Sequence, residues 1–295
     1  MVEQVRRFNR TVTQRVGALD DRFLARDRPL AEARVLWEIG REGCEVRALR
    51  SRLGLDSGHL SRLLRGLETA GLVEVLPASG DRRARTARLT AAGLAERTEL
   101  DHRSDERARS FLEPLSAEER ARMVEAMRQV GRLLTVALVD IREVDPADGD
   151  ARQCLRSYFA ELERRSGAPF DPSTGSTAEP HELRPPLGVF LIAYLHDAPV
   201  GCGGLKHHSD APSDIKRMWV AEPARGLGIG RRLLSELEAR AAAHGDRSVR
   251  LETNRALTEA IALYASAGYV EVPAFNDEPF AHHWFEKTLQ ANATA

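Results

Sequence analysis

The hydrophobic pattern of this 295-residue chain changes its period near residue 138, and this change restricts the possible folds more than any other feature. Before that point, apolar residues recur every three to four positions, as they do on one face of an amphipathic helix. After it, short apolar runs of strand length are interspersed with helical stretches. We therefore predict two domains: residues 1–137, mainly helical, and residues 138–295, which combine helices with a sheet.

Composition and charge agree with two globular domains that have different partners. The chain is 42% hydrophobic and 29% charged, which is typical of globular proteins and provides enough apolar surface for two cores. Residues 1–139 contain 26 arginines and 21 acidic residues, whereas the remainder contains 17 basic and 23 acidic residues. A basic first half and an acidic second half indicate a different partner for each.

The sequence gives no indication of a membrane segment, a secretion signal or a metal site. Apolar runs stay well below the ~20 residues needed to cross a bilayer, and the first residues alternate charged with apolar side chains. The three cysteines, Cys44, Cys154 and Cys202, have no paired spacing, which argues against a disulfide framework or a zinc site. We expect a cytoplasmic protein without a membrane or metal partner.

Residues 46–71 have the pattern of a helix-turn-helix. A short helix with one apolar face reaches the turn Gly54-Leu55-Asp56, and Ser57 is a good N-cap for a second helix that ends near Gly71. Leucines form the buried stripe of this second helix, and small and basic residues lie on its opposite face. That face suits duplex DNA, although a solvated helix surface would have the same pattern. The residues expected to contact DNA are Ser57, Gly58, Ser61, Arg62 and Arg65.

Two β-type runs follow, residues 72–76 and 86–89, around a turn-rich segment. A hairpin with a basic tip directly after a recognition helix is a wing that reaches the DNA backbone or the minor groove. The wing residues expected to contact DNA are Arg82, Arg83 and Arg85. With Asp81 before these arginines and Leu89-Thr90 and Gly93 after them, this stretch resembles the MarR family over about residues 1–136. The resemblance implies a winged-helix DNA-binding domain.

In MarR-like proteins the first and last helices form a dimer interface, and the resemblance implies the same for this chain. The first helix is predicted to run from the N-terminus to Pro29, with one apolar face formed by Val5, Phe8, Val12, Leu19 and Phe23. The last begins at Ser116 with a capping-box sequence and has Met123, Met127 and Val130 on one face, which ordinary core packing would also explain. The expected partners are therefore a second copy of the chain and a near-palindromic double-stranded DNA operator.

The second half contains a glycine-rich turn between a predicted strand and a predicted helix. Residues 225–230, Arg-Gly-Leu-Gly-Ile-Gly, match R-x-x-G-x-G. Glycines allow backbone amides to approach a pyrophosphate, and the N-terminus of the following helix adds its positive dipole end. A Rossmann dinucleotide site would require a third glycine where Arg231 or Leu233 stands, early in a parallel sheet. The turn instead follows three strands arranged as a meander.

A second motif lies on a later helix. Residues 260–269, Ala-Ile-Ala-Leu-Tyr-Ala-Ser-Ala-Gly-Tyr, match A-x-x-L-Y-x-x-x-G-[FY]. With both motifs and the order of its elements, the segment 138–290 resembles the GCN5-related N-acetyltransferase (GNAT) family. The resemblance implies an α+β fold with a mixed, mostly antiparallel central sheet, and acetyl-CoA as the cofactor. It also implies that acetyl-CoA binds in a cleft where the strands ending near Val220 and Thr253 splay apart.

The resemblance further implies roles for individual residues. The pyrophosphate would lie on amides of the glycine-rich turn, and a backbone amide at about Val220 would polarise the thioester carbonyl. Tyr264 would protonate the leaving thiolate as a catalytic acid, although a tyrosine on a helix is also a common core residue. The family's usual asparagine is Leu257 here. The expected cofactor-binding residues are Trp219, Val220, Arg225, Gly226, Leu227, Gly228, Ile229, Gly230, Arg231, Asn254 and Tyr264.

Several residues are candidates for the general base. They are Asp214 and Glu222, beside a predicted strand, and His181 and Glu182 in a long loop; each also suits a solvated charge or a loop cap. The pair His282-His283 would alternate across a strand and, without further ligands, does not indicate a metal.

These patterns predict a dimeric, bifunctional protein that binds DNA as a transcription regulator and acetylates a small amine or an amino-acid-like substrate. Two alternatives stay open. The first is a regulator whose GNAT fold only senses acetyl-CoA or another ligand, and the second is an acetyltransferase whose winged helix serves only for dimerisation. Measured turnover tests the first alternative, and operator binding tests the second.

Overall fold

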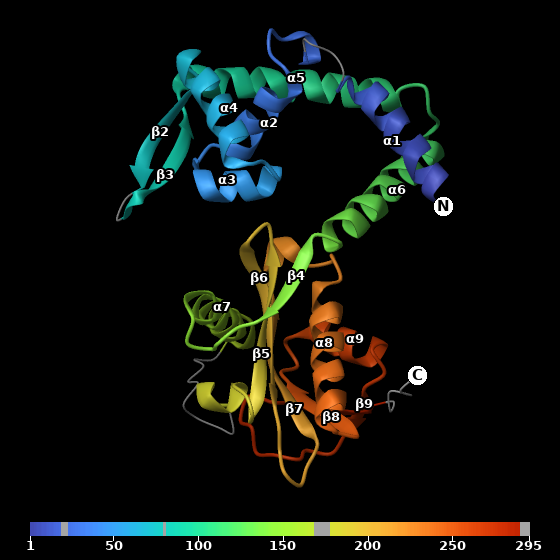
Figure 1. Ribbon diagram of the computed structural model, residues 1–295. Coiled ribbons are helices and arrows are strands. Elements are labelled where there is room, and N and C mark those ends of the chain that lie inside the picture. Colours follow the sequence, from blue (N-terminus) through green and yellow to red (C-terminus); the bar gives the residue numbers. More distant parts are fainter. Residues whose placement is uncertain (19–22, 79–80, 168–177, 290–295) are drawn as a thin grey trace. The chain divides into compact units, whose positions relative to one another are not determined.

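The computed structural model describes residues 1–18, 23–78, 81–167 and 178–289 (Figure 1). The chain divides into two compact units, Met1–Met127 and Arg128–Ala295. The boundary lies within helix α6 (Ala117–Val136), all of which the sequence prediction assigned to the first domain. Within the described ranges, no helix is long and apolar enough to cross a membrane.

Helices dominate the first unit. They are α1 (Val2–Val16), α2 (Leu30–Ile39), α3 (Val46–Leu53), α4 (Ser57–Thr69), α5 (Ala91–Leu112) and the beginning of α6, with a short 3₁₀ helix, η1 (Phe23–Ala25). Three short strands, β1 (Cys44–Glu45), β2 (Val73–Ala78) and β3 (Asp81–Leu89), form an antiparallel sheet in the order β1-β3-β2. The core between α2, α3, α4 and this sheet includes the buried Leu36, Leu49, Leu60 and Leu67. This arrangement is a winged helix, as predicted.

Helix α1 ends earlier than predicted. Gly17 has a left-handed conformation (φ 71°) and its N–H donates to Gln14 O, which is a common way for a helix to terminate. The prediction that this helix continues to Pro29 is therefore wrong, and Phe23 instead belongs to η1, where it is buried. Leu19, which was expected on the same helical face, lies outside the described residues.

The helix-turn-helix forms as predicted, apart from its cap. Asp56, and not Ser57, is the N-cap of α4, because its Oδ1 accepts a hydrogen bond from the His59 N–H at 2.8 Å. This hydrogen bond lowers the pKa of the Asp56 carboxyl group. Gly71 follows the end of α4 with φ 70°, as expected for a glycine at that position. The buried residues of α4 are Leu60, Leu64 and Leu67.

The strands of the wing are longer than predicted. β2 continues to Ala78 and β3 begins at Asp81, so that Arg82, Arg83 and Arg85 lie on a strand and not at the tip of a loop. Cross-strand pairing explains the difference, since it continues through Pro77↔Arg85 and, after a register shift, to Ala78↔Asp81. The turn residues and the side chains of residues 78–83 lie outside the described part, including those of Arg82 and Arg83. The side chain of Arg85 is exposed.

Helices α1 and α6 bury none of their residues within the chain. Helix α6 begins with the predicted capping box, in which Ser116 N–H donates to Glu119 Oε2 and Glu119 N–H donates to Ser116 Oγ. Packing within the described chain therefore does not explain the apolar faces of the two helices. The exposed apolar residues include Val5, Phe8 and Val12 in α1, and Met127, Val130, Leu133 and Leu134 in α6.

A seven-stranded sheet forms the centre of the second unit, in the order β4-β5-β6-β7-β8-β10-β9. Its strands are β4 (Val139–Glu143), β5 (Gly188–Leu195), β6 (Ala198–Lys206), β7 (Ser213–Val220), β8 (Ser248–Thr253), β9 (Val270–Val272) and β10 (His283–Thr288). Neighbouring strands are antiparallel except β7 and β8, which are parallel. The sheet is therefore mixed and mostly antiparallel, as predicted.

Helices cover both faces of this sheet. They are α7 (Gly149–Ser166), α8 (Ile229–His244) and α9 (Thr258–Ser266), with two 3₁₀ helices, η2 (Pro180–Leu183) and η3 (Glu222–Ala224). Figure 1 shows α7 on one face and α8 with α9 on the other. Strand β5 is buried on both faces, since Phe190 and Ile192 belong to the core that includes residues of α7, whereas Leu191 and Ala193 belong to the core of α8.

Two backbone irregularities shape the centre of the sheet. The β5–β6 hairpin turns at His196 and Asp197, both of which have a left-handed backbone conformation. The β6–β7 register shifts between Cys202 and Gly204, and opposite this shift Arg217 has a φ of 61°. A non-glycine residue in this conformation is uncommon and costs free energy, which the surrounding sheet must offset.

Candidate functional site

The sheet opens between β7 and β8. These parallel strands pair at Ser213↔Val249 and Asp214↔Arg250, and their register ends there, well before the C-terminal ends at Val220 and Thr253. Two cavities lie beside those ends, one of about 430 Å³ and one of about 70 Å³. They share several lining residues, among them Tyr158, Met218 and Tyr264, and are therefore adjacent.

The larger cavity lies beside the end of β7, the glycine-rich turn, α7 and α9. Leu227, which was expected to contact the cofactor, packs against the hydrophobic core instead, and Asn254 lines the smaller cavity. The other residues expected to bind the cofactor all line the larger cavity: Trp219, Val220, Arg225, Gly226, Gly228, Ile229, Gly230, Arg231 and Tyr264.

The glycine-rich turn presents backbone to the larger cavity. Gly226 and Gly228 have φ values of 76° and 81°, which residues with a Cβ rarely adopt. Gly228 is the N-cap of α8; no side chain caps this helix, and its first turn contains no acidic residue. The first amides of α8 therefore keep their positive dipole end available to an anion. This geometry suits a phosphate group and, with Arg225 and Arg231 in the same lining, a pyrophosphate.

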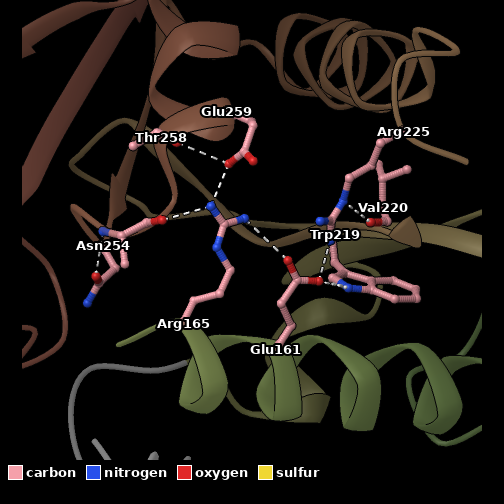
Figure 2. A network of polar contacts seen from close by, with 9 residues as sticks. Glu161, Arg165, Trp219, Val220, Arg225, Asn254, Thr258 and Glu259 are labelled. Atoms are coloured by element: carbon pink, nitrogen blue, oxygen red, sulfur yellow. Dashed lines mark hydrogen bonds and ion pairs between the residues drawn. The ribbon is translucent and has the colours of Figure 1, made fainter. Parts of the chain in front are cut away.

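A network of polar contacts connects α7 with both sides of the opening (Figure 2). Glu161 Oε2 accepts hydrogen bonds from Trp219 Nε1, at 2.9 Å, and from Arg225 Nη2. The Nε of Arg225 donates to Val220 O at 3.0 Å. Arg165 contacts Glu161 and donates to Glu259 Oε2 at 2.6 Å, which ties α7 to the start of α9. The walls of the larger cavity are thus held in place by ion pairs among side chains that line it.

Tyr264 lies between the two cavities. Its ring is buried against Tyr269 and Phe285, with centroids 5.9 and 6.0 Å away, and it lines both cavities. Burial raises the pKa of Tyr264 above its usual value, and Tyr158 and Glu252 raise it further. The phenol therefore keeps its proton at neutral pH, as a proton donor must.

The first unit contains a groove between α3, α4 and the wing strands, with a volume of about 650 Å³. Four of the residues expected to contact DNA line this groove: Ser57, Ser61 and Arg65 of α4, and Arg85 of β3. Two others, Gly58 and Arg62, are exposed on α4. The sequence prediction missed Arg47 and Arg50 of α3, which line the groove as well. Their helical spacing was visible in the sequence, but only packing of α3 beside α4 places them there.

Comparison with known proteins identifies both units. A sequence model of the acetyltransferase (GNAT) family matches residues 154–269. An IAA acetyltransferase from Azospirillum brasilense is 34% identical over 112 residues, which is 38% of this chain and 73% of that protein. The chain belongs to the GNAT family of acetyltransferases. A MarR family model also matches residues 27–84, so the chain combines a MarR family domain with an acyltransferase domain of the GNAT family.

Two solved structures are similar to parts of this chain. The structure of a GNAT family acetyltransferase from Staphylococcus aureus is 18% identical with a TM-score of 0.43, over 52% of this chain and 99% of that one. The PcaV transcriptional regulator of Streptomyces coelicolor is 24% identical with a TM-score of 0.34, over 43% of this chain and 89% of that one.

The structure does not bring the expected base candidates of the GNAT domain to either cavity. Asp214 is buried and forms ion pairs with Arg250, at 2.6 Å, and with Lys216, at 3.5 Å. Burial opposes ionisation of this carboxyl group, but the nearby cations outweigh it and lower its pKa. Asp214 also lines neither cavity, so its carboxylate does not face an acceptor bound there. Glu222 is exposed in η3 and lines neither cavity.

The other candidates have structural partners. Glu182 forms an ion pair with Lys206 and completes the capping box of η2, while His181 is exposed beside it. His283 Nδ1 lies 2.7 Å from Glu271 Oε1, and His282 is exposed. None of these side chains lines the two cavities.

Asn254 and Glu252, at the end of β8, differ in how their side chains are used. Asn254 Nδ2 donates to Phe280 O at 2.7 Å and its Oδ1 accepts from the Ala256 N–H at 2.9 Å, so both ends stabilise the local backbone. Glu252 lines the smaller cavity, 10% exposed, and its Oε1 accepts from Lys216 Nζ at 2.5 Å. The sequence prediction missed Glu252, because in a strand with alternating burial it resembles an ordinary outward-facing residue.

Proposed function

We propose that the GNAT domain transfers the acetyl group of acetyl-CoA to a small amine. The observation that carries this proposal is the position of Tyr264, which lines both a cavity with a glycine-rich anion site and a second, smaller cavity with ionisable walls. Acetyl-CoA would occupy the larger cavity and the acceptor amine the smaller one. The residues present fit this cofactor, because the pyrophosphate would lie on the amides of Gly226, Gly228, Ile229 and Gly230.

The bound cofactor supplies an activated acetyl group, and the chain supplies the proton transfers. Glu252 is placed to accept a proton from the acceptor ammonium group, directly or through a water molecule. The free amine nitrogen would then attack the thioester carbonyl carbon, and a backbone amide near Val220 would polarise the carbonyl oxygen. As the C–S bond breaks, Tyr264 would donate its proton to the thiolate, and the proton that the new amide nitrogen loses would restore the Tyr264 phenol. This sequence requires no nucleophilic serine or cysteine.

We propose in addition that the MarR domain binds double-stranded DNA as a homodimer. The groove that contains Ser57, Arg65 and Arg85 supports this proposal, since it joins a helix with small and basic residues to a basic wing. The exposed apolar faces of α1 and α6 support dimerisation, because such faces in a folded chain are usually covered by a partner. A two-fold dimer suits a near-palindromic operator.

The three cysteines are buried and free, which suits a cytoplasmic protein.

The acetyltransferase proposal is tested by an acceptor screen. Purified protein is incubated with acetyl-CoA and a panel of amines, and free CoA is measured with a thiol reagent. The dimer proposal is tested by light scattering of the wild type and of Leu133→Glu, which places a charge on the exposed face of α6. A dimer that the substitution converts to a monomer supports the proposal, and a wild-type monomer at micromolar concentration contradicts it.

A further inference from the structure

The smaller cavity has charges of both signs in its lining. Lys216 and Arg217 come from β7, Glu252 from β8, and Glu278 from the segment before β10. Two cations and two anions give a lining without net charge. Such a lining favours a ligand that carries both a positive and a negative group over a simple amine, whose single charge would leave one side of the lining without a partner.

Arg217 is the cation in this lining that is available to a ligand. Its guanidinium carbon lies 4.6 Å from the centroid of the Phe159 ring, which fixes the plane of the group. Within the described part of the chain it donates one hydrogen bond, a long one of 3.5 Å to Ala178 O. A guanidinium has five N–H donors, so most of its capacity to bind a planar anion is unused.

Lys216 differs from Arg217 in this respect. Its side chain is 6% exposed, and its Nζ lies 2.5 Å from Glu252 Oε1 and 3.5 Å from Asp214 Oδ2. The ammonium group is thus already neutralised by two carboxylates. Its position holds Oε1 of Glu252, while Oε2 has a long contact of 3.5 Å with Asn276 Nδ2. Glu252 is therefore oriented by Lys216 and keeps one oxygen that is only weakly held.

The opposite charges of Arg217 and Glu252 act on the same space. Burial raises the pKa of Tyr158 to about 12. Three nearby charged groups also act on this pKa: Arg217 lowers it, and Glu252 and Glu278 raise it. Tyr158 is thus close enough to all three groups to feel their charge. Glu252 also raises the pKa of Tyr264, so the acid and the proposed base belong to one cluster.

The strained backbone of Arg217 supports a role for this side chain in binding. Its φ of 61° arises at the register shift between β6 and β7, and the same sheet position would accept a glycine without strain. Backbone strain of this kind clusters at active sites and ligand-binding sites, where the surrounding structure maintains it. Here the strain places Arg217 in the lining of the cavity beside Tyr264.

We infer that the acceptor is an amino acid, with its carboxylate on the guanidinium of Arg217 and its amine directed to Glu252. This inference rests on the proposed acetyltransferase function and names the substrate class of that site. The acceptor contributes a carboxylate that makes two parallel hydrogen bonds to Arg217. Deprotonation and attack then follow the steps given above, with the amine nitrogen held between Glu252 and the thioester.

The test compares matched acceptors. For each common amino acid, the free acid, its primary amide and the corresponding decarboxylated amine are offered with acetyl-CoA. The free acid is expected to have a kcat/KM ~10- to 100-fold above the other two, which is the size expected for one charge-assisted hydrogen-bonded pair. Amides or amines that are used as well as the acids would overturn the inference and leave the proposed function intact.

A variant separates the role of Arg217 from a structural one. Arg217→Gln keeps the first three carbons of the side chain and a polar end group but removes the charge. It is expected to raise the KM for the amino acid ~10- to 100-fold, to leave the KM for acetyl-CoA unchanged, and to abolish the preference for the acid over the amide. Arg240→Gln, which removes a surface arginine of α8 paired with Glu236, is the matched control and should change none of these values.

Equilibrium binding distinguishes failure of the inference from failure of the proposed function. Saturation-transfer NMR in the presence of CoA detects amino-acid binding without turnover. Binding by the wild type that Arg217→Gln abolishes supports the placement of the carboxylate on Arg217. If no acceptor is then acetylated, the proposed transfer reaction is contradicted, although the cavity still binds an amino acid. If no amino acid binds the wild type and none is acetylated, the inference is overturned.

Discussion

Replacement of Tyr264 by phenylalanine tests the proton donor of the proposed reaction. Phenylalanine keeps the ring that packs against Tyr269 and Phe285, so the core should be preserved. Only the phenolic hydroxyl group, with its proton, is lost. General acids contribute ~10²- to 10⁴-fold to a rate. Because a thiolate whose conjugate acid has a pKa of ~8.5 is a fairly good leaving group, we expect the low end of that range. Turnover should therefore fall ~10²-fold, equivalent to about 2.7 kcal/mol in the activation free energy.

The assay measures a single turnover of enzyme-bound acetyl-CoA, so that slow product release does not hide the chemical step. Acetyl-CoA affinity, measured by calorimetry, should be unchanged. The matched control is Tyr269→Phe, which removes the hydroxyl group of a neighbouring buried tyrosine that lines neither cavity. A single-turnover rate for Tyr264→Phe equal to that of the control would refute the role of Tyr264 and make it a core residue.

The pKa of Tyr264 also predicts a pH dependence. The group acts while protonated, and its pKa is raised above the ordinary value of 10.0, mainly by burial. Its proton is therefore lost only above that pH. The wild-type rate should show no decrease due to Tyr264 between pH 6 and ~9.5. A decrease in this range that is absent from Tyr264→Phe would show that the phenol ionises at ordinary pH.

Three further substitutions test the remaining parts of the account. Gly228→Trp should abolish acetyl-CoA binding measured by calorimetry, because a side chain at a left-handed φ of 81° strains the turn and occupies the anion site. Equal affinity in wild type and variant would contradict the cofactor assignment. Glu252→Gln should lower turnover at least ~10²-fold. The control Glu222→Gln, at an exposed residue of η3, should not change it, and similar rates for the two variants would exclude Glu252 as the base. Changing Arg62 or Arg65 to alanine should weaken DNA binding measured by fluorescence anisotropy. Each lost phosphate contact should reduce the slope of the logarithm of the binding constant against the logarithm of the salt concentration by ~0.9. Unchanged slopes would place both side chains away from DNA.

The arrangement of the main elements was predictable because it depends on local periodicity. The leucine stripe of α4 follows from a spacing of three to four residues, and the strands of the meander before the glycine-rich turn follow from short apolar runs. Errors occurred where a short-range interaction competes with that pattern. Gly17 ends α1 although the apolar spacing continues, and Asp56 caps α4 in place of the equally suitable Ser57. The wing strands continue past the expected turn because cross-strand pairing stabilises them.

The candidate site was predictable only where a motif carries it. The glycine-rich turn and Tyr264 belong to sequence motifs, and the structure places both beside one cavity. The ionisable lining of the smaller cavity has no such motif. Asp214 and Glu252 are both acidic residues near strand ends, and only the tertiary structure shows that Asp214 is paired with Arg250 and Lys216 while Glu252 faces the cavity. Arg217 depends in the same way on the register shift between β6 and β7.

The most direct test of the central claim is release of free CoA from acetyl-CoA in the presence of an acceptor panel. The account predicts that at least one amine, with amino acids foremost, releases CoA well above the rate of simple hydrolysis, and that mass spectrometry detects the acetylated amine. It also predicts that Tyr264→Phe reduces this release ~10²-fold. If the protein binds acetyl-CoA but no acceptor increases CoA release, the GNAT domain is a ligand sensor attached to a regulator, and the proposed reaction is wrong.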